Sequence, residues 1–386
     1  MNNQRPRPAT DRPLRVLVVA ARFPPDLGGT ENHTYEVSKR IAQRTDTELT
    51  VLATDRSGDR PASETMEGFT VRRCRAYPRR RDYYFAPDIY RLILRGNYDL
   101  VHCQGIHTAV PVLAMLAARR RGVPYVVTLH TGGHPSAFRR RFRSAHWRIL
   151  APLLRRAAAI VAVSRFEQRV FQEACRIEAA RFTVVPNGGN LPAGADRPAP
   201  VPGRIVSAGR LERYKGHQRV VEALPIVKQT IPHATLRIYG AGPYEPELQA
   251  SIGSLGVEQS AEIQFIAPDN RARVAAALCE AEVFAALSEY EAHPVAVMEA
   301  LTLGIPTVGL DTTGLADLVS DGLVTGIPKD ASPTTVAQVL VAALAEGGRS
   351  DPAALPTWDD AAAALARIYT DVAAAGSKTS SSADAR

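Results

Sequence analysis

Short apolar runs alternate with longer amphipathic stretches along the chain, and this alternation predicts the elements of the fold. Leu14–Ala20, Glu48–Ala53 and Leu100–Cys103 have the length and composition of buried strands, and helical patterns fit between several such runs. Repeated β–α alternation with apolar strands is typical of a parallel sheet covered by helices on both faces. The pattern therefore predicts doubly wound parallel α/β sheets.

The predicted strands form two series separated by residues 191–203, whose Pro- and Gly-rich sequence is typical of a linker. A length of 386 residues also suits two domains, each large enough for a core of its own. The other predicted strands are Thr70–Arg73, Tyr125–Leu129, Ile160–Val163, Arg204–Ala208, Thr235–Tyr239, Ile263–Ile266, Val283–Leu287 and Thr307–Leu310. We expect disorder in 1–13, a first domain at 14–195, a second at 196–355, a helix at 356–375 that crosses back to the first domain, and a disordered tail at 376–386.

The composition is that of a soluble globular protein, with 45% hydrophobic residues and a mean hydropathy of −0.12. No apolar run approaches the roughly 18–20 residues needed to span a bilayer. The first 13 residues are polar and show no secretion signal, so we expect a cytoplasmic protein. Its cysteines share no metal-ligand spacing and are expected to be reduced thiols: Cys74, Cys103, Cys175 and Cys279.

The net charge of +8 conceals a strong asymmetry between the two halves of the chain. Residues 1–198 hold 33 Lys and Arg against 17 Asp and Glu, a balance of +16, and the remainder holds 14 against 22, or −8. The arginine triplets at 79–81, 119–121 and 139–141 lack interleaved aromatics of the kind that stack on bases, so we expect no nucleic acid. A solvated basic face is the favoured interpretation, and contact with an anionic membrane is the second.

The most informative stretch is Ser288–Pro306. A buried strand at Val283–Leu287 leads into a polar loop, and a helix follows from Pro294 to Leu303. Glu291 is thus expected just ahead of a helix N-terminus, which attracts phosphate, and Glu299 about one and a half turns inside the helix. Two carboxylates flanking an anion site indicate that a neutral, hydroxyl-rich group such as a sugar lies between them.

Other candidate residues follow predicted strands. Gly28 and Gly29 form a turn between the first strand and a helix, where backbone N–H groups can face a phosphate. His130 ends a strand, the place where ligand groups collect in open α/β sheets. Arg210 and Lys215 lie in a Gly-bounded loop and make a compact anion clamp. No Asp-x-Asp sequence is present to hold a divalent cation, so we expect no metal.

These motifs together resemble the retaining glycosyltransferases of family GT4, whose fold is GT-B: two Rossmann-like domains facing across a cleft. The resemblance covers about residues 14–373 and depends on the order of its parts: Gly28-Gly-Thr-Glu31, His130, Pro186-Asn-Gly188, Arg210 with Lys215-Gly216, and Glu291 and Glu299 in an E-x7-E element. The chain departs from the family at Ala292-His293-Pro294, where Gly-Phe-Gly is usual.

The resemblance implies transfer of a hexose or aminohexose from a nucleoside diphosphate sugar, which we expect to be a UDP-sugar, with retention of the anomeric configuration. It implies that Arg210 and Lys215 stabilise the leaving diphosphate, that Glu291 binds the transferring sugar, and that Glu299 binds the ribose. The implied catalytic residues are Arg210, Lys215, Glu291 and His130; the implied substrate-binding residues are Gly28, Gly29, Glu31, Gly240, His293, Pro294, Val295, Ala296 and Glu299. No cofactor is implied beyond the sugar nucleotide, which is a co-substrate.

The acceptor is less well indicated. The sequence Ala292-His293-Pro294 and the Arg/Ala-rich composition resemble transferases of actinobacterial aminoglycoside pathways, which implies a sugar or aminocyclitol acceptor such as a 2-deoxystreptamine pseudodisaccharide. The acidic first-domain residues that would suit such a cation are Glu31, Asp26 and Asp88. A membrane-associated glycolipid or polysaccharide transferase, a nucleotide-sugar 2-epimerase and a non-enzymatic basic binding protein are the alternatives.

Overall fold

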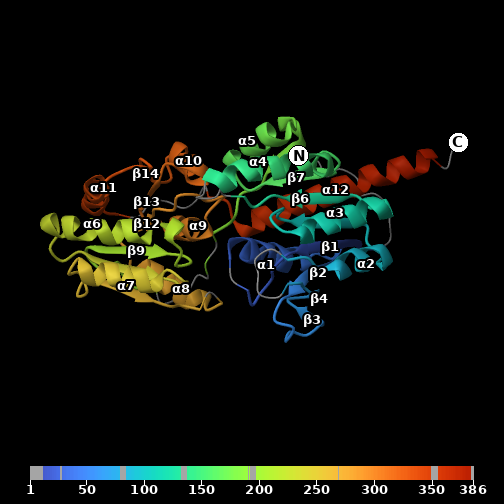
Figure 1. The fold of residues 1–386 in the computed structure, drawn as a ribbon. Helices are drawn as coiled ribbons and strands as arrows, with labels where there is room; N and C mark the ends of the chain where they lie inside the picture. The colour runs from blue at the N-terminus through green and yellow to red at the C-terminus, as the bar shows by residue number, and fades with distance from the viewer. Residues whose placement is uncertain are drawn as a thin grey trace, which may run out of the picture.

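The computed structural model describes residues 12–26, 28–78, 84–131, 137–189, 191, 197–267, 269–348 and 355–383, without the side chains of 137–145 and 377–383. Two α/β domains lie side by side, each built on one sheet with helices on both faces (Figure 1). The predicted fold class is confirmed. No helix among the described residues is long and apolar enough to cross a membrane.

The first domain contains an eight-stranded sheet in the order β3-β4-β2-β1-β5-β6-β7-β8. Its strands are β1 Leu14–Ala20, β2 Thr47–Asp55, β3 Ser63–Met66, β4 Phe69–Arg75, β5 Leu100–Gln104, β6 Tyr125–Thr128, β7 Ala159–Ala162 and β8 Phe182–Val184. All neighbours are parallel except β3 and β4, which form an antiparallel hairpin at the edge. Glu67 and Gly68 both have positive φ in its turn, as two-residue hairpins require. The sequence analysis did not predict β3, because its short polar pattern lacks an apolar run.

Helices cover this sheet in two layers. One layer contains α2 Pro87–Arg95, α3 Ala109–Arg121, α4 Ala137–Leu154 and α5 Arg165–Cys175, and the opposite layer contains α1 Gly29–Ala42 and α12 Trp358–Ala383. Apolar residues from α12, including Trp358 and Tyr369, are fully buried against the strands. The end of the chain therefore completes the core of the first domain (Figure 1).

Both ends of the chain differ from the expected disorder where the structure describes them. Helix α12 continues to Ala383, past residue 376, because its alanine-rich sequence has no helix-breaking proline. At the other end, Arg12 binds the carboxylate of Asp99 at 2.7 Å, which ties residue 12 to the start of β5. Residues 1–11 and 384–386 lie outside the described residues, and so do residues 192–196 of the predicted linker.

The second domain has a six-stranded parallel sheet in the order β11-β10-β9-β12-β13-β14. Its strands are β9 Arg204–Ala208, β10 Thr235–Tyr239, β11 Ala261–Gln264, β12 Val283–Ala286, β13 Thr307–Leu310 and β14 Thr325–Ile327. Helices α6 His217–Thr230, α7 Glu245–Ser254 and α11 Pro333–Glu346 pack on one face; α8 Arg271–Cys279, α9 Val295–Thr302 and α10 Thr313–Ser320 pack on the other. Short β8 and β14 were not predicted from the sequence.

Helix α9 is the predicted helix of the Ser288–Pro306 stretch, with one small difference at its start. Pro294 has extended backbone angles and caps the helix from outside, so the first helical residue is Val295. Gly304 follows the helix with a φ of 72°, the left-handed conformation expected after a helix C-terminus.

The two domains also meet through charged groups of α5 and α10. Asp317 of α10 accepts a hydrogen bond from the backbone N–H of Phe166 at 2.7 Å and binds Arg169 at 2.9 Å. Arg165 binds Asp321 at 2.8 Å. A carboxylate at the N-terminus of α5 is favoured by the helix dipole as well as by the arginines. The contact joins the basic first half of the chain to the acidic second half.

Candidate active site

A cleft of about 2200 Å³ lies between the two domains, at the carboxyl ends of strands from both sheets. Ligand sites of open α/β sheets form at these ends. All of the residues predicted from the sequence line this cleft: Gly28, Gly29, Glu31 and His130 from the first domain, and Arg210, Lys215, Gly240, Glu291, His293, Pro294, Val295, Ala296 and Glu299 from the second.

The centre of the second-domain wall is an ion pair between Lys215 and Glu291. The Lys215 Nζ donates to Glu291 Oε1 at 2.5 Å, and both side chains are less than one-fifth exposed. Burial by itself lowers the pKa of Lys215, but the negative charge of Glu291 more than offsets this, so the pKa lies above its ordinary value. The lysine is therefore held as a cation next to the carboxylate.

Both loops that carry this pair are fixed by their own backbones. Lys215 ends the short 3-10 helix η2 Arg213–Lys215, and Gly216 follows with a φ of 75°, where a Cβ atom would collide with the carbonyl of Leu287. The backbone N–H of Glu291 donates to Thr313 Oγ1 at 2.9 Å, and its carbonyl accepts from Gly314 N at 2.9 Å. The start of α10 thus holds Glu291 in place.

Arg210 lies on the same wall and remains exposed to the cleft. Its guanidinium donates to the hydroxyl of Tyr214 at 2.8 Å. The Tyr214 ring stacks on Tyr290, with centroids 4.2 Å apart, next to Glu291 in sequence. The aromatic pair was not predicted, because two tyrosines so far apart in sequence give no local pattern.

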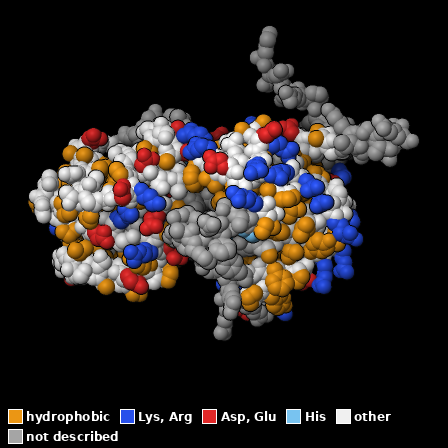
Figure 2. Space-filling model, turned by 45° about the horizontal axis from the view of Figure 1, so that its top comes forward, with side chains coloured by type: hydrophobic (Ala, Val, Ile, Leu, Met, Phe, Trp, Pro, Cys, Tyr) orange, Lys and Arg blue, Asp and Glu red, His pale blue; other side chains and the backbone are white. Residues whose placement is uncertain are grey.

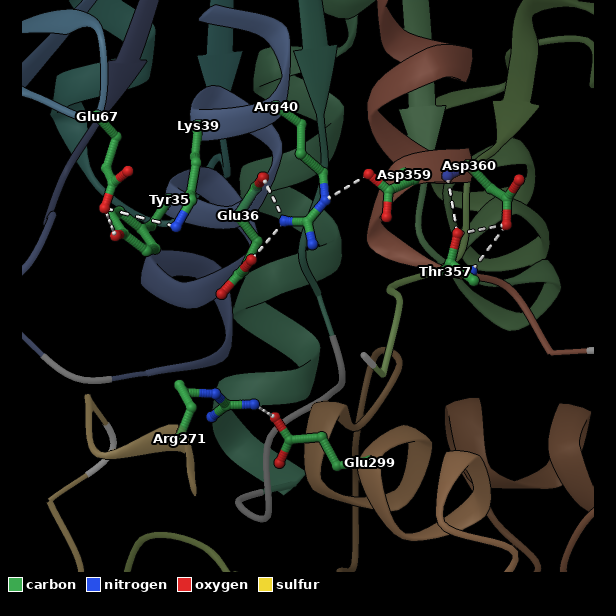
Figure 3. Close-up of polar contacts among 10 residues, drawn as sticks. All are labelled: Tyr35, Glu36, Lys39, Arg40, Glu67, Arg271, Glu299, Thr357, Asp359 and Asp360. Atoms are coloured by element: carbon green, nitrogen blue, oxygen red, sulfur yellow. Dashed lines mark hydrogen bonds and ion pairs between the residues drawn. The ribbon is translucent and has the colours of Figure 1, made fainter. Parts of the chain in front are cut away.

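Glu299 is buried in α9 and ion-paired with Arg271 at the start of α8 (Figure 3). Burial raises the pKa of Glu299, and the charge of Arg271 opposes that rise. The pair faces α1 of the first domain, where Arg40 binds both Glu36 and Asp359 of α12 (Figure 3). Arg271 was missed in the sequence, because its closeness to Glu299 comes from the packing of two helices that are separate in the chain.

The N-terminus of α9 opens into the cleft, since Pro294, Val295 and Ala296 line it. The first N–H groups of a helix have no intrahelical acceptor and carry partial positive charge, which suits a phosphate. Just before it, the carbonyl of His293 accepts from Asn187 Nδ2 at 2.7 Å. The Asn187 side chain also contacts His33 Nδ1 at 2.8 Å, so one amide connects α1, the domain junction and the α9 loop.

The first-domain wall contains His130 and the Gly28–Glu31 turn. His130 follows β6 with a φ of 56°, and its Nε2 contacts Gln104 Oε1 at 2.7 Å. Burial lowers the pKa of His130 well below its ordinary value, so the ring is neutral, and Nε2–H donates because an amide oxygen only accepts. Glu31 is half-buried at the start of α1, and burial raises its pKa. These groups present a neutral imidazole and one carboxyl group to the cleft.

Among the described residues, no group of three or more His, Cys, Asp or Glu side chains is placed to hold a metal ion. The charged groups that line the second-domain wall of the cleft include Arg210, Lys215 and Arg271, with Glu291 and Glu299. The arrangement suits binding of a polyanion next to a hydroxyl-rich group.

Comparison with known proteins gives the family. The model of Glycosyltransferase Family 4 matches residues 27–191, and that of Glycosyl transferases group 1 matches residues 199–347. The chain belongs to the family 4 glycosyltransferases. It is therefore a retaining hexosyltransferase that uses a nucleotide sugar, as the sequence analysis expected.

Its relatives include a GDP-mannose:cellobiosyl-diphosphopolyprenol alpha-mannosyltransferase of Komagataeibacter xylinus, 26% identical over 388 residues and covering 94% of both chains. A phosphatidyl-myo-inositol mannosyltransferase of Mycobacterium leprae is 28% identical over 76% of this chain and 80% of its own. Among solved structures, Anabaena HepE in complex with UDP and glucose matches with a TM-score of 0.66 and 19% identity, covering 97% of this chain and all of its own. None of these names concerns aminoglycosides, so the expected aminoglycoside specialisation receives no support from them.

The buried histidines around the cleft predict a loss of stability in acid. Burial lowers the pKa values of His33 and His293 to about 4, against 6.5 for an accessible ring. Below pH 6.5 these histidines bind protons in the unfolded chain but stay neutral in the folded protein. The free energy of unfolding should therefore fall as the pH drops from 6.5 to 4. Each such histidine contributes a slope of about 1.4 kcal/mol per pH unit.

Urea unfolding at a series of pH values measures this slope. His293→Phe removes one buried imidazole and should make the slope shallower by about one histidine. His146→Gln, which changes an exposed ring, is the control and should leave it unchanged. An equal slope in His293→Phe and the parent protein would contradict the assignment.

Proposed function

We propose that the protein transfers a hexose from a nucleoside diphosphate sugar to a hydroxyl group of a lipid-linked glycan or phospholipid acceptor. The main support for the proposed donor is the Lys215–Glu291 pair. It combines a buried cation, suited to a diphosphate, with a carboxylate suited to sugar hydroxyls, and both line the cleft beside the N-terminus of α9. The acceptor half is supported by the relatives that act on a diphosphopolyprenol-linked glycan and on phosphatidyl-myo-inositol.

On the donor side, the diphosphate lies between Arg210, Lys215 and the α9 N-terminus. When the bond from the anomeric carbon to the phosphate oxygen breaks, these groups stabilise the negative charge on the leaving diphosphate. Glu291 accepts hydrogen bonds from sugar hydroxyls, and Glu299 accepts them from the ribose once Arg271 has turned toward the nucleotide. The acceptor oxygen forms the new bond on the same face of the sugar, and its proton passes to the departing phosphate oxygen.

Two of the three carboxylates expected to bind a polycationic aminocyclitol are already ion-paired within the protein. Asp26 is bound by Arg60 at 2.8 Å, and Asp88 is bound by Arg91 at 3.0 Å on the exposed side of α2. Glu31 is the remaining member of the predicted acidic set, and burial favours its neutral form. A cation-rich acceptor would therefore find little compensating charge, which favours the lipid-linked acceptor over the 2-deoxystreptamine pseudodisaccharide.

An acceptor panel tests this proposal. The purified protein is incubated with UDP-glucose or GDP-mannose, and release of the nucleoside diphosphate is measured alone, with a short-chain polyprenyl-diphosphate disaccharide, with phosphatidylinositol in detergent, and with a 2-deoxystreptamine pseudodisaccharide. We expect a lipid-linked acceptor to accelerate release with one donor. Acceleration by the aminocyclitol alone would overturn the acceptor assignment and leave the donor chemistry intact.

The cationic clamp predicts catalysis without a metal. Lys215→Ala should lower kcat/KM by about 2–4 kcal/mol in transition-state free energy, because it removes one pre-oriented positive group from the leaving phosphate. The parent enzyme should remain active in excess EDTA. Lys329→Ala, an exposed lysine of the same domain, is the control. Loss of activity in EDTA with recovery in magnesium or manganese would show that a cation does the work assigned to Lys215.

The two glutamates should have separable effects. Glu291→Gln should lower kcat more than it weakens nucleotide binding, because Glu291 contacts the transferring sugar. Glu299→Ala should chiefly weaken binding of the nucleoside diphosphate, measured by calorimetry, because it removes the ribose acceptor and leaves Arg271 unpaired. Glu289→Gln changes a carboxyl group two residues from Glu291 that lies outside the cleft, and serves as the control. Equal, mild effects of both changes would indicate that the pair is merely structural.

A further inference from the structure

The outer faces of α3 and α4 form a surface rich in arginine and lacking acid. No Asp or Glu occurs between Asp99 and Glu167, whereas the same stretch contains eleven arginines. The exposed members whose side chains the structure describes on these two helices include Arg119, Arg120, Arg121, Arg148, Leu116 and Ile149, and we call these six residues the α3–α4 surface. Both helices belong to the same layer over the first sheet.

Two aliphatic side chains of this surface are exposed among the arginines. Ile149 is 75% exposed and Leu116 is 39% exposed, although both helices offer buried positions that other apolar residues occupy. Leu116, Arg119 and Arg120 are spaced i, i+3 and i+4, so they share one side of α3. Arg148 directly precedes Ile149 on α4. Each helix thus presents one exposed aliphatic side chain with at least one exposed arginine near it in sequence.

Among the described residues, the arginines of this surface are not neutralised by carboxylates. Arg119, Arg120, Arg121 and Arg148 form no ion pair there, whereas on other parts of the first domain Arg60 pairs with Asp26 and Arg73 with Glu64. In Figure 2, basic and apolar side chains gather over the first domain, and acidic and basic ones alternate over the second. The excess positive charge of residues 1–198 therefore lies mainly over the first domain.

The surface lies behind the first-domain wall of the cleft. Trp147 and Leu150 of α4 line the cleft, and Arg148 and Ile149 between them point outward. Likewise, α3 begins in the cleft wall at Ala109 and ends at the arginine triplet. A partner that binds the outer surface is therefore held within one helix of the first-domain wall of the cleft.

We propose that the α3–α4 surface docks on an anionic lipid bilayer, with the arginines on headgroup phosphates and Ile149 and Leu116 entering the interface. This rests on the proposed lipid-linked acceptor, which the docking would bring to the cleft. Basic side chains can bind the phosphates of an anionic bilayer, and exposed aliphatic side chains beside them can enter the apolar region beneath the headgroups. Nucleic acid fits less well, because the six residues of the surface include no Phe, Tyr or Trp to stack on bases, and the exposed His146 of α4 lines the cleft instead.

Vesicle flotation tests the electrostatic part. The full chain is mixed with vesicles of phosphatidylcholine, or of phosphatidylcholine and phosphatidylglycerol at three to one. We expect flotation only with the anionic vesicles, and release in 1 M salt, where screening acts within about 3 Å. The triple variant Arg119→Gln, Arg120→Gln, Arg148→Gln should bind them roughly 100-fold more weakly, since each basic residue near such a surface contributes about fivefold.

A variant with the same change in net charge is the control. Arg273→Gln, Lys329→Gln and Arg367→Gln remove three exposed cations from other faces and should leave flotation unchanged. Equal weakening in both triple variants would mean that only net charge matters and would overturn the docking surface. Binding of the parent protein to duplex DNA, lost in the first triple variant, with no flotation, would replace the lipid by nucleic acid.

The aliphatic part has its own pair of variants. Ile149→Ser changes an exposed residue and should weaken flotation several-fold at intermediate salt, whereas Leu255→Ser, 39% exposed on the second domain, should not. Thermal unfolding checks that both variants keep the fold. Unchanged binding in Ile149→Ser would remove the insertion step from the proposal.

An acceptor-independent readout separates this proposal from the proposed function. Slow hydrolysis of the sugar nucleotide in the absence of lipid uses only the donor side and should be equal in the parent and the arginine triple variant. Transfer to a lipid acceptor without any flotation would refute the docking surface and leave the function standing. Flotation without transfer to any lipid acceptor would refute the function and leave the surface.

Discussion

The buried ion pair between Lys215 and Glu291 is the contact on which the donor side of the cleft depends. It joins two loops that are 76 residues apart, and each charge makes the burial of the other tolerable. Removing one member would leave an uncompensated charge in a poorly hydrated site, at a cost of about 3–5 kcal/mol. The pair therefore fixes the relative position of the η2 loop and the α9 N-terminus, and it holds a cation at the wall of the cleft, where we propose that the diphosphate binds. A bound diphosphate would compete with Glu291 for Lys215, which links donor binding to release of the carboxylate toward the sugar.

Hydrogen bonds at the domain junction hold the loop before α9. The Asn187 side chain bonds His33 of the first domain and the backbone of His293 in the second, so this loop is attached to both domains. The loop is also tied to α10 through Glu291, and α10 in turn contacts the N-terminus of α5 through Asp317. A change in the separation of the domains would therefore shift the position of Glu291 through these bonds. Helix α12 completes the connection, because its buried face belongs to the core of the first domain.

The departure from the usual family sequence at Ala292-His293-Pro294 has a structural consequence. His293 is buried, and among the described residues its Nδ1 has no hydrogen-bond partner, which costs about 1–3 kcal/mol in a folded protein. The imidazole is neutral at ordinary pH, since burial lowers its pKa to about 4. Pro294 has no N–H, but it precedes the helix, so the N–H groups of Val295 and Ala296 still face the cleft. The helix N-terminus on which the predicted anion site depends is therefore kept in spite of the substitution.

The sequence by itself determined the fold class, most strand positions and some of the residues of the cleft. Strand periodicity is local, and in a parallel sheet every strand delivers its following loop to the same edge. Gly28 therefore had to lie at the same edge as His130, and Arg210 at the same edge as Glu291; that the two edges face each other was decided by the arrangement of the domains. What the tertiary structure alone decided are pairings between elements distant in the chain. Arg271 opposite Glu299, Asp317 on the N-terminus of α5 and the Tyr214–Tyr290 stack depend on how helices and loops pack, for which no spacing rule exists. The edge strand β3 was also not predicted, because a strand that faces solvent needs no apolar pattern. The arginine clusters were visible in the sequence. Packing alone decided which arginines lie near the exposed Leu116 and Ile149 and which pair with carboxylates, because exposure is a property of the folded surface.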